Sequence, residues 1–149
     1  MKIYVDADAC PVKSEVMRVA ERHGLVVHMV SNTWMRLPPN PLLRLQVVAN
    51  GLDKADDWIV QAIETGDIAI TSDIPLAARC LDKGARVLGP TGKLFDHDGI
   101  GMALAMRDLN AHLRDAGKIP GSGPPFGPKD RSRFLQVFEE TIQAVKRGK

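Results

Sequence analysis

Apolar residues along the first 90 positions alternate between two patterns. Short β-branched runs predict strands at 2–6 (KIYVD), 25–30 (LVVHMV), 46–50 (QVVAN), 67–73 (DIAITSD) and 85–89 (ARVLG). Helical spacing predicts helices after Pro11, over 55–65 and after Pro75, with Gly24, Gly66 and Gly84 as their stops. Strands that alternate with helices in this way indicate an α/β fold with a parallel sheet.

The remaining segments have a different character. Residues 31–44 contain Trp34 and three prolines, which predicts an irregular loop, with a short helical turn at 42–45 as an option. A helix is expected over 100–115, within the segment 91–116. Eight of the twelve residues at 117–128 are Gly or Pro, so this stretch should be a loop.

The last helix is expected over 129–147, with Asp130 near its start as the cap. Its apolar stripe needs a surface to pack on, so we expect the helix to dock back on the preceding core. The stripe consists of Phe134, Phe138, Ile142 and Val145. We therefore expect one domain over 1–149, built from a βα core at 1–90, the helix at 91–116, the loop at 117–128 and the last helix.

Composition places few limits on function. Apolar residues make up 44% of the chain and charged residues 26%, as in soluble globular proteins. The net charge of +2 does not by itself indicate a nucleic-acid binder. Cys10 and Cys80 have no CxxC spacing, no secretion signal is visible, and no apolar run approaches the ~20 residues of a membrane span. We therefore expect a cytoplasmic protein with reduced thiols and no membrane partner.

Aspartates mark the points where this fold would gather ligands. Asp6 and Asp8 end the first strand, Asp73 ends a later one, and Asp56 and Asp57 open a helix. In a parallel sheet the carboxyl ends of the strands share one edge, where ligands bind. Clustered carboxylates without zinc-type His or Cys spacing suit Mg²⁺ or Mn²⁺. The sequence thus predicts a metal site made by Asp6, Asp73 and one of Asp56 and Asp57.

Each aspartate also has a purely local interpretation. Asp73 precedes Pro75 and could simply cap the next helix, and one of Asp56 and Asp57 could be a first-turn acid. Asp6 is the hardest to explain locally, because an ionised acid directly after a buried strand normally needs a partner. The metal cluster is the favoured interpretation of the set.

The strings DADACPVK, KADDWI, TSDIPLA and GPTGKLF make the chain resemble the YaiI/YqxD family of uncharacterised bacterial proteins. That family looks like a branch of the PIN-like (PilT N-terminus-like) nuclease superfamily. The resemblance covers essentially the whole chain. It implies a three-layer α/β/α fold with acids around Mg²⁺ or Mn²⁺ at one sheet edge. Asp6, one of Asp56 and Asp57, and Asp73 match those acids.

This chain departs from the PIN-like pattern in two ways. It carries the additional Asp8, which we include among the candidate catalytic residues, and its middle acid is Asp where many PIN domains use Glu. Other residues are candidates for substrate binding, because a cation or hydroxyl near the acids could hold a phosphate. They are Lys13, Ser72, Arg107, Arg131 and Arg133.

Three functions remain open at this point. The first is a metal-dependent nuclease or phosphoesterase acting on RNA or DNA. The second is a haloacid-dehalogenase-like phosphatase that uses the DxD of Asp6 and Asp8 with the Thr71 hydroxyl. The order of motifs argues against it, because the paired acids at 56–57 precede the strand at 67–73, whereas in such a phosphatase they would follow it. The third is an inactive site in a module that binds nucleic acid or protein. A homo-oligomer is compatible with each of these functions.

Overall fold

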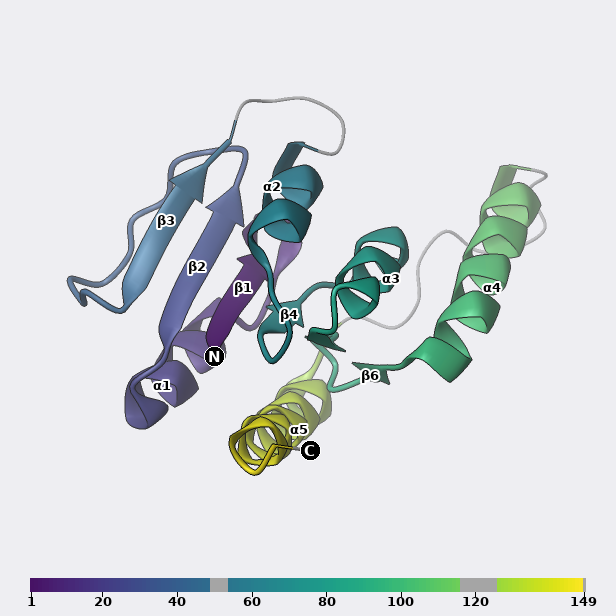
Figure 1. Cartoon of the computed structure of the whole chain (residues 1–149). Helices are drawn as coiled ribbons and strands as arrows, with labels where there is room; N and C mark the ends of the chain where they lie inside the picture. Colours follow the sequence, from purple (N-terminus) through teal and green to yellow (C-terminus); the bar gives the residue numbers. More distant parts are fainter. Residues whose placement is uncertain (49–53, 116–125, 149) are drawn as a thin grey trace.

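A six-stranded sheet forms the centre of the protein (Figure 1). This is a computed structural model that describes residues 1–48, 54–115 and 126–148, without the side chains of Ala9 and of residues 107–115. The strand order is β3-β2-β1-β4-β5-β6, and all neighbours are parallel except β5 and β6. The strands are β1 (Lys2–Asp6), β2 (Val26–Ser31), β3 (Leu43–Val47), β4 (Ile68–Ile70), β5 (Arg86–Leu88) and β6 (Leu94–Phe95).

Helices cover both faces of this sheet, which confirms the three-layer α/β/α expectation. They are α1 (Lys13–His23), α2 (Lys54–Ala62), α3 (Ile74–Asp82), α4 (His97–Asp115) and α5 (Pro128–Lys146), with a 3-10 turn, η1 (Ala7–Ala9), after β1. Alternate strand residues enter two separate cores. Ile3 and Val5 pack with α1 and α5, whereas Tyr4 packs with α2 and α3. Helix α4 lies beside α3.

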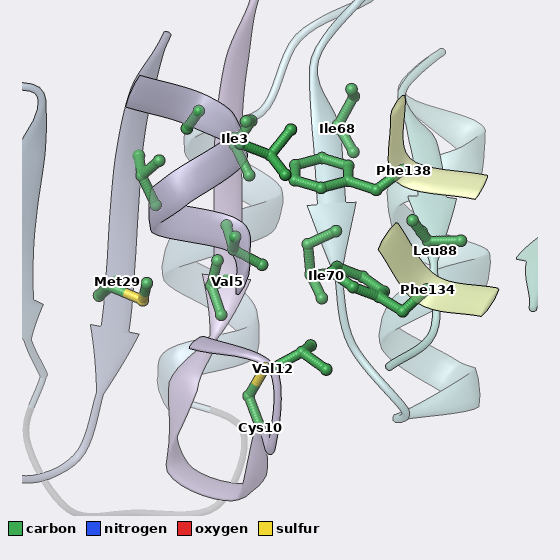
Figure 2. Close-up of a cluster of buried hydrophobic side chains, with 14 of the residues drawn as sticks. Ile3, Val5, Cys10, Val12, Met29, Ile68, Ile70, Leu88, Phe134 and Phe138 are labelled. Carbon is green, nitrogen blue, oxygen red and sulfur yellow. The ribbon is translucent and has the colours of Figure 1, made fainter. Parts of the chain in front are cut away.

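The last helix docks on the sheet through two phenylalanines, as its apolar stripe predicted. Phe134 and Phe138 are fully buried, and their rings are stacked 5.3 Å apart. They lie against Ile68 and Ile70 of β4 and near Leu88 of β5 (Figure 2). Helix α5 therefore completes the layer that α1 begins, and it closes the core under β4.

The order of the strands creates a reversal in the middle of the sheet. From β1 the chain winds through α1 to β2 and β3, and it then returns through α2 to β4 on the other side of β1. The point between β1 and β4 is a topological switch point, at which connections leave in opposite directions and open a crevice beyond the carboxyl ends. Asp6 ends β1 at this point, and Thr71 follows β4.

Two local expectations were wrong, and one strand was missed. The strand expected over 46–50 is present but begins earlier, as β3 over 43–47, and the helical turn considered at 42–45 is absent, because Leu43 and Leu45 pack on the core while the strand pairs with β2. Residues 49 and 50 lie outside the described residues. The antiparallel β6 was not anticipated. Asp130 is not the N-cap: Gly127 occupies that position, and its N–H donates to the Asp130 carboxylate at N3, 3.0 Å away. Most of the predicted loop at 117–128 lies outside the described residues.

None of the described helices combines the length and the apolar composition that a membrane crossing requires.

The phenylalanine packing gives the first testable expectation. Phe138→Ala should lower the free energy of unfolding by about 3–5 kcal/mol, because it removes a fully buried ring and leaves a cavity between α5 and β4. Urea unfolding followed by circular dichroism measures this loss. Gln136→Ala, at an exposed position of the same helix, should change the value by no more than about 0.5 kcal/mol. Equal effects of the two substitutions would show that α5 is not docked.

Candidate functional site at the switch point

The hydroxyl of Thr71 connects two of the predicted acids. The register pairs Val5 with Ile70, so the next residues, Asp6 and Thr71, lie side by side. Thr71 Oγ1 donates to Asp6 Oδ2 at 3.0 Å and accepts from the backbone N–H of Asp73, also at 3.0 Å. Asp73 Oδ1 in turn accepts from Leu76 N–H at 3.0 Å, which caps α3. Asp73 therefore caps α3, as its local interpretation predicted, and its backbone is also linked to Asp6 through the Thr71 hydroxyl.

Asp6 lies in an environment that disfavours its charge. Burial raises the pKa of its carboxyl most, and the hydrogen bond from Thr71 opposes that effect. The negative charges of Asp73 and Asp8 raise the pKa of Asp6 further. Two of the other predicted acids thus lie close enough to act on the charge of Asp6. Such crowding is a common feature of catalytic and metal-binding sites.

A small cavity opens beside these groups. Its volume is about 10 Å³, which is roughly the space of one water molecule. It is lined by Asp6, Cys10, Ile70, Thr71, Ser72 and Pro90. Burial raises the pKa of the Cys10 thiol, so this side chain lines the cavity in its uncharged form. The cavity can take a single ion or water, and it cannot enclose a nucleoside.

Asp8 and Lys13 both have structural partners. Asp8 accepts from Ser31 Oγ at 2.6 Å and from the backbone N–H of Asn32 at 3.0 Å, so it fastens the turn after β1 to the end of β2. Lys13 Nζ donates to the carbonyls of Ala7 and Cys10, at 3.1 and 2.9 Å. Both side chains hold the turn that leads away from Asp6.

The structure does not place the middle acids with the other three. Asp57 forms an ion pair with Arg79 of α3 at 3.0 Å. Asp56 lies near Cys80, and its charge opposes ionisation of that buried thiol, whose pKa burial raises to about 12. Across the part of the chain that is described, no three His, Cys, Asp or Glu side chains gather in a way that could hold a metal ion. The three-acid metal site therefore stays a prediction.

The predicted substrate-binding residues differ in their surroundings. Ser72 is exposed and lines the cavity. Arg131 pairs with the buried Glu15 of α1 and lies over the Phe126 ring, 5.1 Å from its centroid. Arg133 is exposed, 3.9 Å from Asp130. The side chain of Arg107 lies outside the described residues.

Sequence reasoning missed several partners of these residues. Glu15 was not singled out, although it is 4% exposed and one of its carboxylate oxygens, Oε2, has no hydrogen-bond partner among the described residues. Ser31 and Arg79 were also missed. Ser31 could have been found from its position, because it ends β2, the strand that pairs with β1. Nothing in the spacing of Asp57 and Arg79 along the chain indicated their pairing.

The electrostatics of Asp6 predict an unusual response to substitution. Because folding raises its pKa above 3.8, the charged carboxylate costs stability, and the cost grows as the pH rises through the folded-state pKa. Asp6→Asn should therefore raise the melting temperature by a few degrees at about pH 7 and change it little at about pH 3.5. Thermal unfolding at both pH values measures the difference.

The exposed Asp82, at the end of α3, provides the matched control. Asp82→Asn should leave the melting temperature unchanged at both pH values. A lower melting temperature for Asp6→Asn at neutral pH would contradict the crowding of charge at this position.

Comparison with known proteins gives the chain its family. A family model described as "Uncharacterized BCR, YaiI/YqxD family" matches residues 4–144. Similar proteins include the UPF0178 protein of Rhodospirillum rubrum, 58% identical with both chains fully covered, and that of Parvibaculum lavamentivorans, 58% identical over 98% of this chain and 96% of the relative. The UPF0178 protein of Rhizobium etli is 54% identical over 97% of this chain and 93% of the relative. No solved structure matches the chain. The protein belongs to the uncharacterised YaiI/YqxD family.

Proposed function

We propose that this protein is a metal-dependent nuclease or phosphoesterase acting on RNA or DNA, with Asp6 and Asp73 as its central acids. The observation that carries the proposal is the position of the Asp6 carboxyl. It ends β1 at the switch point, it is repelled by Asp73 and Asp8, and it borders a cavity that takes one small ion. Crowded carboxylates at such a position are stabilised by a cation.

The residues present suit Mg²⁺ or Mn²⁺ with few protein ligands. Mg²⁺ is often bound by one or two carboxylates, with waters and substrate phosphate filling the remaining positions. The described hydrogen bonds use Oδ2 of Asp6 and Oδ1 of Asp73, and they leave the other oxygen of each carboxylate for a cation. When bound, such an ion polarises a phosphoryl oxygen and lowers the pKa of a bound water.

The chain's own residues would hold the reacting groups in place. Thr71 fixes the orientation of Asp6 through its hydroxyl, while the capped helix start fixes Asp73. The exposed hydroxyl of Ser72 lies beside the cavity, where it could donate to a phosphate oxygen. Because the cavity is too small for a nucleoside, the phosphate would approach from the solvent side, as a nucleic-acid backbone can.

The dehalogenase-like alternative is less well supported. It needs Asp8 as an acid that exchanges protons with the substrate. Both oxygens of Asp8 already accept hydrogen bonds from the end of β2. The hydrogen bond from Thr71 to Asp6 is compatible with either enzyme, so it does not favour the phosphatase.

Metal binding is the direct test of the proposed ligands. Mn²⁺ at 100 times its dissociation constant should stabilise the wild-type protein by about 2.7 kcal/mol, or about 5–10 °C in melting temperature. Asp6→Asn and Asp73→Asn should each remove most of this metal-dependent rise. Asp57→Asn should keep it, because Asp57 pairs with Arg79, and Asp82→Asn should keep it as the surface control. Full Mn²⁺ stabilisation of the Asp6→Asn/Asp73→Asn double variant would refute the ligand assignment.

Cleavage is measured separately, with end-labelled single-stranded RNA and DNA in the presence of Mn²⁺. Wild-type protein and Asp82→Asn should cut at equal rates, and Asp6→Asn should lose at least about a hundredfold. Metal binding at Asp6 without any cleavage of RNA, DNA or a phosphodiester model compound would reject the enzyme and favour the inactive binding module.

A further inference from the structure

Strand β3 gives one edge of the sheet little of the usual protection. Unpaired edges invite pairing with another chain, and proteins commonly protect them with short strands, prolines, charged side chains (lysine above all) or bulges. The opposite edge is short, because β6 has only two residues. In contrast, β3 lies at the other edge (Figure 1) and is five residues long, with no proline or lysine and with Arg44 as its one charged residue. Its position at the edge leaves Arg44 and Val47 exposed.

The hydrogen bonds to β2 show which backbone groups of β3 point outward. Val27 N–H donates to the carbonyl of Leu42, and Val48 N–H donates to the carbonyl of Ser31. Because backbone direction alternates along a strand, Arg44 and Gln46 turn their backbone groups toward β2. Leu43, Leu45 and Val47 therefore turn theirs away from the sheet.

Only one of these outward groups has a partner among the described residues. Leu43 N–H donates to the carbonyl of Asn40 at 2.9 Å. The carbonyl of Leu43 and both groups of Leu45 and Val47 have no hydrogen-bond partner among the residues that the structure describes. This leaves a run of donors and acceptors spaced for an added antiparallel strand.

We propose that β3 pairs with β3 of a second copy of this chain, in antiparallel orientation about a twofold axis at Leu45. In this register Leu45 lies opposite Leu45 of the other copy and exchanges two hydrogen bonds with it. Val47 lies opposite Leu43 of the other copy, and its N–H meets the one outward carbonyl that Leu43 keeps available. The two symmetry-related Val47–Leu43 contacts add two more hydrogen bonds, and the two sheets become continuous.

In this register the side chains of β3 are compatible with those of the same strand in the second copy. Leu43 and Leu45 pack toward the α1 side of the sheet, and Val47, 44% exposed, follows at the same two-residue spacing. The twofold pairing would cover Val47 with Leu43 of the other copy. On the opposite face Arg44 would lie across from the neutral Gln46, so no like charges meet.

A groove beside β3 also carries complementary charges. It has a volume of about 590 Å³ and is lined by α1 and by residues 38–41 and 43. Its helical wall presents Arg18 and Glu21, which have no ion-pair partner in the part of the chain that the structure describes. A twofold axis brings the same patch of each copy together. A second copy carries the same two opposite charges beside its own β3, and its Val47 N–H matches the outward carbonyl of Leu43. These features favour a second copy over an unrelated peptide as the occupant.

The proposal is tested by oligomeric state and by amide exchange. Sedimentation velocity should show a reversible dimer that increases with concentration. In hydrogen exchange, the amides of Leu45 and Val47 should become slower as the dimer forms, whereas that of Arg44, already bonded to β2, should not. A wild-type protein that stays monomeric throughout, or a dimer that leaves both amides unchanged, would overturn the assignment.

Two variants target the edge and one serves as the control. Val47→Pro removes the outward N–H without touching the bonds to β2, and Val47→Lys places a charge against Leu43 of the other copy. Each should weaken dimerisation at least about tenfold, because every change occurs twice in the dimer. Val47→Thr keeps the N–H and the strand preference and should dimerise as the wild type does. If Val47→Pro fails to fold, Val47→Lys decides, and a dimer unaffected by Val47→Lys refutes the pairing.

Discussion

The hydrogen bonds of the Thr71 hydroxyl join the two halves of this fold at one point. This group donates to Asp6 at the end of β1 and accepts from the amide of Asp73 at the start of α3. It therefore spans the switch point, where the chain's connections leave in opposite directions. Thr71 is itself 3% exposed, so these bonds lie in a poorly hydrated setting where their geometry is well defined. The proposed site depends on this bridge, because it holds two acids near each other.

The arrangement carries an electrostatic cost that the rest of the fold must offset. Burial and the charges of Asp73 and Asp8 disfavour the ionised form of Asp6, whereas the hydrogen bond from Thr71 favours it. The two packed cores and the docking of α5 under β4 supply the stability that permits this. Proteins commonly accept such strain where a ligand will relieve it. The protein is thus a stable fold that carries one electrostatically unfavourable carboxylate, that of Asp6.

Much of the scaffold could be predicted from the sequence, because strong local patterns agreed with tertiary packing. The runs at 2–6 and 25–30 became β1 and β2, and the phenylalanine stripe of the last helix docked as expected. Residues 43–45 were misassigned because neighbouring leucines and prolines obscured a two-residue alternation, which becomes clear only from the pairing with β2. The two-residue β6 has too little sequence signal to be found.

The candidate site was predictable only in part. Asp6 and Asp73 could be placed together because both follow parallel strands that end at one edge. The partner of Asp57 could not be predicted. Its ion pair with Arg79 depends on how α2 and α3 pack, which the spacing of residues along the chain does not show. The roles of Asp8 and Lys13 in holding the turn after β1 likewise arise from contacts with β2 and with backbone carbonyls.

A crystal structure of the wild-type protein grown with Mn²⁺ is the most direct test of the central claim, because anomalous scattering locates the ion. The account predicts one peak in contact with Asp6 and Asp73, beside Thr71. The absence of a peak there, or an ion held at Asp56 and Asp57 instead, would contradict it.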